Sequence, residues 1–82
     1  MKSYEKLKKE KISHLQWCLD TLKLKEDKLS EEDYIYLYRY IFCTIQDMEN
    51  MESLQANEYY RKRMYAKNIK YLLSKCNIEL SV

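Results

Sequence analysis

Neither glycine nor proline occurs among the 82 residues of this chain. Average usage would place about ten of these two residues in a chain of this length. They supply the positive-φ positions of tight turns and the loops that hold phosphate groups. Without them the chain has little means of forming a β-rich fold or a glycine-loop active site. We therefore expect an all-α protein that forms a single domain.

Apolar residues at spacings of three and four predict a small three-helix bundle, with helices near 3–26, 30–50 and 54–76. Ser3 and Ser30 are suitable N-caps, and the three acids after Ser30 complement the positive end of a helix dipole. Asn77 is a suitable left-handed C-cap for the third helix, and we expect residues 79–82 to fray. The inner faces of the three helices are expected at Ile12, Leu15, Leu19 and Leu22; at Leu37, Ile41, Ile45 and Met48, with Tyr34 and Tyr38 on the same broad stripe; and at Tyr65, Ile69, Leu72 and Cys76.

The boundary between the second and third helices is the least defined. Nothing between Glu31 and Cys76 forbids a helix, and one helix of that length would extend about 70 Å, too long for a single small core. Asn50, Ser53 and Asn57 offer caps, so we expect a break near 50–57. The alternative is a continuous second and third helix in an intertwined dimer.

Charge is distributed unevenly along the chain. Residues 1–29 have a balance of +3, residues 30–58 of −6 and residues 59–82 of +5. This pattern fits an acidic middle helix between two basic neighbours, so much of the basic charge would be neutralised within the fold. No stretch free of formal charge exceeds eight residues, far short of the ~20 that span a bilayer. Because the N-terminus also lacks the apolar stretch of a signal peptide, we expect a cytoplasmic protein.

The residue types needed for catalysis or metal binding are scarce. His14 is the only histidine, and no sequence relationship joins it to a nucleophile or to a carboxylate. The three cysteines are 25 and 33 residues apart, which suits buried free thiols better than a disulfide or a zinc site. We therefore expect no enzymatic activity, no cofactor and no metal.

Aromatic side chains are more abundant than so short a bundle can easily bury. The chain has nine tyrosines, one tryptophan and one phenylalanine, and such residues dominate protein–protein interfaces. We expect a protein that binds another protein through an aromatic helical face and regulates or inhibits it. The thin core also favours a homodimer. The candidate interface residues are Trp17, Tyr36, Tyr40, Tyr59 and Tyr60.

Two other functions compete with this hypothesis. One is a nucleic-acid-binding accessory protein that uses the basic, tyrosine-rich third helix; its candidate residues are Tyr60, Arg63, Lys67, Lys70 and Tyr71. The other is a purely structural assembly subunit. Twelve lysines against three arginines indicate A/T-rich codons, as in a low-GC bacterium or its phages and plasmids. Small helical regulators and inhibitors would fit such a source.

Overall fold

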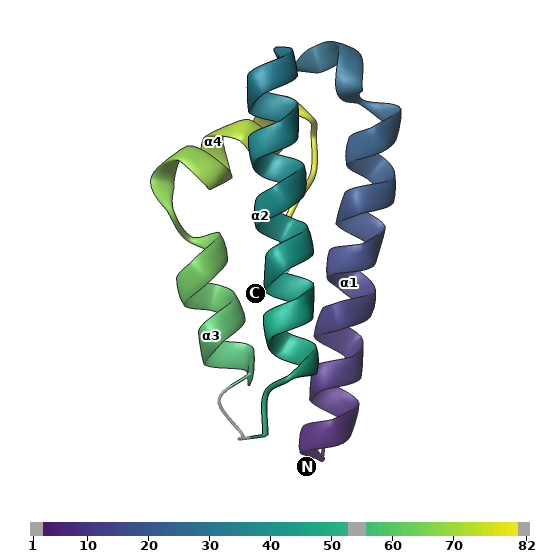
Figure 1. The fold of residues 1–82 in the computed structure, drawn as a ribbon, viewed down its shortest axis with the longest axis vertical. Coiled ribbons are helices and arrows are strands. Elements are labelled where there is room, and N and C mark those ends of the chain that lie inside the picture. Colours follow the sequence, from purple (N-terminus) through teal and green to yellow (C-terminus); the bar gives the residue numbers. More distant parts are fainter. Residues whose placement is uncertain (1–2, 53–55, 81–82) are drawn as a thin grey trace.

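The computed structural model describes residues 3–52 and 56–80, and all regular structure in these ranges is helical. Its elements are α1 (Tyr4–Leu24), a short 3-10 helix η1 (Glu26–Lys28), α2 (Glu31–Glu49), α3 (Ala56–Met64) and α4 (Lys67–Lys75). Figure 1 shows α1 and α2 running antiparallel, with α3 on the other side of α2 and α4 turned across the bundle. The molecule measures 39 × 18 × 17 Å. The all-α prediction is confirmed.

The predicted number of helices is wrong, because the expected third helix is two. The helix that begins at Ala56 ends at Met64, and Ala66 has extended backbone with φ −54° and ψ 132°. This turn lets Ile69 and Leu73 of α4 enter the same core as Met64. Tyr65, expected on the inner face, lies at the turn and is 36% exposed.

The predicted break after the second helix is confirmed, so the continuous alternative is wrong. Helix α2 ends at Glu49, and Met51 lies outside any helix. The last turn of α2 has no basic residue of its own. Lys8 of α1 takes that role, donating from Nζ to the carbonyl oxygens of Glu49 (2.9 Å) and Met51 (3.0 Å). The expected start of the next helix, at residue 54, lies outside the described residues.

Side-chain caps fix the starts of the two long helices. The Oγ atoms of Ser3 and Ser30 accept from the backbone N–H groups of Lys6 (3.3 Å) and Asp33 (3.2 Å). At the other end of the chain, Asn77 adopts φ 57° after α4, as its sequence position suggested. The Asn77 N–H then donates to the Ser74 carbonyl and the Ile78 N–H to the Leu73 carbonyl, which is a Schellman motif.

One continuous core joins all four α-helices. The inner stripe of α2 is buried as expected, and its members are Leu37, Ile41, Ile45 and Met48. On α1, Leu15 and Leu22 are buried, whereas Ile12 and Leu19 are half-buried at the edge. Ile78 is buried and Leu80 packs against the core; residues 81–82, where fraying was expected, lie outside the described part. The core therefore uses one side of α2 and leaves the other side free.

Candidate protein-binding face

The side of α2 that faces away from the core carries large apolar side chains. Ile35 and Tyr36 are each 42% exposed, Tyr38 is 39% exposed and Phe42 is 44% exposed. We call these four residues the α2 face. The rings of Tyr38 and Phe42 are nearly parallel, with centroids 6.4 Å apart. Exposed apolar side chains in such a contiguous group are typical of a protein interaction site.

The spacing of residues in α2 explains this face. Ile35, Tyr38 and Phe42 recur at intervals of three and four, which places them on one side of a helix. Leu37, Ile41 and Ile45 follow the same spacing two or three positions later and form the buried side. Helix α2 therefore carries two apolar stripes that are adjacent around its circumference, one buried in the core and one largely exposed. At the edge of the exposed stripe, the Tyr36 hydroxyl accepts a hydrogen bond from Asn68 Nδ2 of α4 at 2.7 Å.

A shallow hollow of about 430 Å³ lies at the edge of the α2 face. Ile35, Tyr36 and Tyr40 give it an apolar lining, and Arg39 and Arg63 contribute guanidinium groups; Glu32 and Cys43 complete the lining. Within the described residues no carboxylate forms an ion pair with Arg39. The hollow is thus an apolar recess beside an unpaired positive charge.

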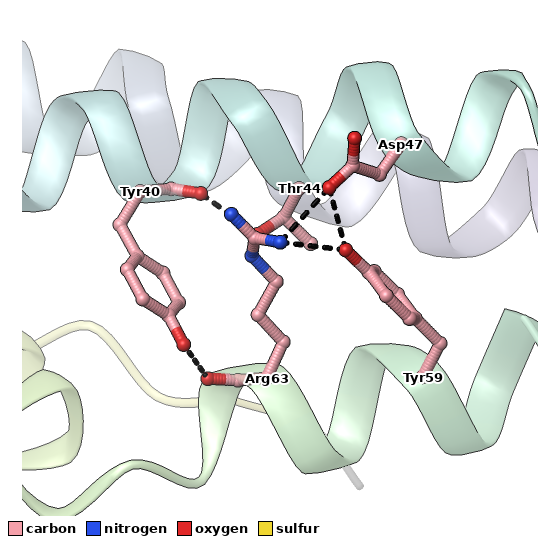
Figure 2. Close-up of polar contacts among 5 residues, drawn as sticks. All are labelled: Tyr40, Thr44, Asp47, Tyr59 and Arg63. Carbon is pink, nitrogen blue, oxygen red and sulfur yellow. Dashed lines mark hydrogen bonds and ion pairs between the residues drawn. The ribbon is translucent and has the colours of Figure 1, made fainter.

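Arg63 forms the wall of this hollow and joins α3 to α2 (Figure 2). Its Nη1 atom lies 2.8 Å from Asp47 Oδ2 and 2.6 Å from the Tyr59 hydroxyl, which itself donates to Asp47 Oδ2 at 2.6 Å. The guanidinium also lies over the Tyr40 ring, 4.9 Å from the centroid. We call Tyr40, Asp47, Tyr59 and Arg63 the arginine cluster. It holds α3 in register against α2.

The arginine cluster has the chemistry of a structural contact. The Tyr40 hydroxyl donates to the Arg63 carbonyl at 2.5 Å, near the end of α3. Burial and the hydrogen bond to Asp47 raise the pKa of Tyr59 above its ordinary value, although Arg63 acts in the opposite direction. The phenol therefore keeps its proton and donates it to the carboxylate.

The structure separates the five predicted interface residues into two groups. Trp17 is 51% exposed on α1 and Tyr36 belongs to the α2 face. Tyr40 and Tyr59 are half-buried in the arginine cluster, and Tyr60 is 1% exposed within the core. Their sequence positions gave no sign of this, because Tyr40 lies on the side of α2 that α3 covers, whereas Tyr59 and Tyr60 lie on α3 itself and face its neighbours.

The sequence prediction missed Ile35, Tyr38 and Phe42. Tyr38, expected with Leu37 on the buried stripe of α2, is one of the exposed rings. The signal that identifies the three residues is their own spacing of three and four, which runs beside the buried stripe. Tyrosines occupy every second position from 34 to 40, and this alternation made the helical spacing of the exposed side chains hard to recognise.

The residues of the nucleic-acid alternative do not form one surface. Tyr60 is buried and Arg63 is paired with Asp47, so neither is free for phosphate. Lys67, Lys70 and Tyr71 are exposed on α4, beyond the turn that ends α3. The stripe expected along a single helix is thus divided between a buried half and an exposed half.

The remaining reactive side chains are mostly packed into the fold. Cys18 and Cys76 are buried thiols as expected, but Cys43 is exposed beside the α2 face. Cys18 Sγ lies 3.7 Å from His14 Nε2, and burial raises the pKa of this thiol to about 11. Burial and Lys11 lower the pKa of His14. This pair therefore favours a neutral thiol beside a neutral imidazole.

Two classes of feature are missing from the described part of the chain. No group of three or more histidine, cysteine, aspartate or glutamate side chains in residues 3–52 and 56–80 is placed to hold a metal ion. In the same ranges, no helix has both the length and the apolar character needed to cross a membrane. Comparison with protein-family models, with curated proteins and with solved structures found no match to this chain.

Proposed function

We propose that this protein binds another protein through the α2 face and regulates or inhibits it by that contact. The supporting observation is that four large apolar side chains of one helix are each about two-fifths exposed. Fully burying an exposed side chain of this size is worth roughly 1.5–3 kcal/mol, so covering the exposed two-fifths would gain on the order of 1 kcal/mol for each. A partner that covers them recovers this free energy.

The composition of the α2 face also resembles the centre of an interface. Aromatic residues and arginine are enriched there, while lysine and acids are depleted. The two tyrosines, Phe42 and Arg39 match this composition, and the hollow beside them could receive one side chain of the partner. The partner we expect presents an apolar side chain to the hollow and a carboxylate to Arg39.

The identity of the partner can be tested by crosslinking from the face itself. A photoreactive phenylalanine analogue at position 42 should capture the partner in cells that express the gene, whereas the same analogue at Tyr71 on α4 should not. Tyr71 is a matched control, because it is aromatic and 61% exposed but lies on α4 and not on α2. Equal capture from both positions would contradict the proposal.

Affinity measurements on the captured complex provide the second test. Tyr38→Ala and Phe42→Ala should each weaken binding by about 2 kcal/mol if they are central contacts, and Tyr71→Ala should leave it unchanged. Sedimentation of the purified chain at micromolar concentration shows whether a second copy is the partner. A dimer that Phe42→Ala dissociates would identify the α2 face as a self-association surface; a monomer would rule out the homodimer.

A further inference from the structure

A second surface, distinct from the α2 face, lies where α1 meets α4 and the segment that follows α4. A groove of about 780 Å³ occurs there, with Trp17, Tyr65 and Lys70 among its lining residues. Ser74 and Asn77 add polar groups, and Glu79 is the one carboxylate among the lining residues. The groove thus combines aromatic rings with a lysine.

Trp17 is held in place at this groove while much of its surface stays open. Its indole lies nearly parallel to the His14 ring, with an angle of 17° and centroids 5.8 Å apart. The side chain is nevertheless 51% exposed. An indole supported from one side and open to solvent is a flat platform on which another planar group can stack.

The cations around Tyr65 have no acidic partners. Lys70 Nζ lies 4.8 Å from the centroid of the Tyr65 ring, and the Arg61 guanidinium carbon lies 6.0 Å from it. No carboxylate in the described ranges pairs with Arg61, Lys67 or Lys70. The neighbouring Lys62, by contrast, pairs with Glu58 at 3.2 Å. Lys70 lines the groove, and Arg61 and Lys67 lie within one or two helical turns of Tyr65 or Lys70 without lining it, so none of these three charges is neutralised by a carboxylate of the described residues.

We propose that this groove binds single-stranded nucleic acid, with a base stacked on Trp17 and phosphates near Arg61, Lys67 and Lys70. Stacking platforms next to backbone-binding cations are the combination that single strands require. An acidic peptide would use the cations but would have no planar group for the indole. A duplex has its bases already stacked, so it would also leave Trp17 unused.

The test uses the protein's single tryptophan as the reporter. Titration with a twelve-residue oligothymidylate at low salt should quench Trp17 fluorescence. Three phosphate contacts predict that the logarithm of the binding constant falls with the logarithm of salt with a slope of about −2, and Lys70→Glu should reduce that slope by about 0.7 or more. Absence of quenching and of binding would overturn the proposal.

Variants distinguish binding in the groove from nonspecific electrostatic attraction between the protein and the oligonucleotide. In anisotropy measurements with a labelled oligonucleotide, Trp17→Ala should weaken binding about fivefold or more, and Glu79→Gln should strengthen it. Lys62→Glu makes the same charge change as Lys70→Glu on a lysine that already has a partner, so it should have the smaller effect. Circular dichroism would confirm that each variant is folded. An equal loss from Lys62→Glu would overturn the proposal, because it would show diffuse attraction.

Competitors distinguish the class of ligand. Polyglutamate that displaces the oligonucleotide at equal charge would assign the groove to acidic peptides, and tighter binding of a duplex would assign it to double-stranded nucleic acid; either result overturns the proposal. Phe42→Ala should not change oligonucleotide binding. The proposal for the groove and the proposal for the α2 face can therefore be refuted independently of each other.

Discussion

Arg63 contributes to the packing of the fold, whereas its sequence context suggested nucleic-acid binding. It follows Arg61 and Lys62 in a basic run that looks like a solvated stripe. In the structure its guanidinium pairs with Asp47 and lies over two tyrosine rings, with 28% of the side chain exposed. Lys62, one position earlier, is 76% exposed and pairs only with Glu58 of its own helix. Adjacent cations thus have different roles because only one points toward α2.

Arg63→Ala should lower the free energy of unfolding by about 2 kcal/mol, since it leaves the Asp47 carboxylate without its partner and removes the cation from the Tyr40 ring. Lys62→Ala should change it by no more than about 0.5 kcal/mol, because its ion pair is solvent-exposed. Urea denaturation of both variants measures the difference. Equal losses would show that the arginine cluster adds nothing beyond an ordinary surface ion pair.

At the scale of elements, the start of α2 is set locally, whereas its end is set by a neighbouring helix. Ser30 caps α2 with its own hydroxyl, which the adjacent sequence predicts. The end of α2 depends instead on Lys8 and Tyr4 of α1, whose side chains donate to the carbonyl of Met51. The α3–α4 break has no local signal either, because Ala66 provides no side-chain cap.

Ser30→Ala should destabilise the protein by about 1 kcal/mol, the usual cost of removing an N-cap. Ser3→Ala removes a cap of the same type, with Oγ 3.3 Å from the Lys6 nitrogen. It should cost less, because the Tyr4 hydroxyl still holds the first turn of α1 to the Met51 carbonyl when the cap is removed. Thermal unfolding of the two variants compares them directly; a larger loss from Ser3→Ala would contradict this ordering.

At the scale of the whole molecule, the acidic α2 contacts both basic segments, although α1 and α3 also pack directly against each other. Helix α2 contacts Lys8 of α1 and Arg63 of α3. The basic residues of α4 form no ion pair with a carboxylate of the described residues. The fold therefore neutralises part of the C-terminal charge and leaves Lys70 unpaired in the groove that Trp17 also lines.

The free energy of unfolding should fall in alkaline solution, because burial makes the folded chain hold its thiol and phenol protons more tightly. Burial raises the pKa of the Cys18 thiol from 9.0 to about 11 and raises the pKa of the Tyr60 phenol above 10.0. The folded chain therefore holds these protons more tightly than the unfolded chain. The resulting stabilisation is complete below pH 9 and is lost as pH rises through 11.

Urea denaturation at intervals between pH 7 and pH 11 would measure this loss. Cys18→Ala should flatten the decline between pH 9 and pH 11, because alanine has no proton to release. The decline that remains belongs to the buried tyrosines. An unchanged profile in Cys18→Ala would show that this thiol does not contribute.

The sequence by itself determined the all-α class, the starts of the first two helices, the buried stripe of α2 and the left-handed position of Asn77. Each depends on residues within a few positions of one another, where backbone geometry and capping act directly. Tertiary structure decided the α3–α4 break, the burial of Tyr60 and the pairing of Arg63 with Asp47. It also decided which side of α2 stays exposed. These depend on which helices pack together, and a helix with two apolar sides does not indicate which side its neighbours cover. The absence of glycine and proline restricts the chain to helices but leaves their packing to contacts between residues far apart in the sequence.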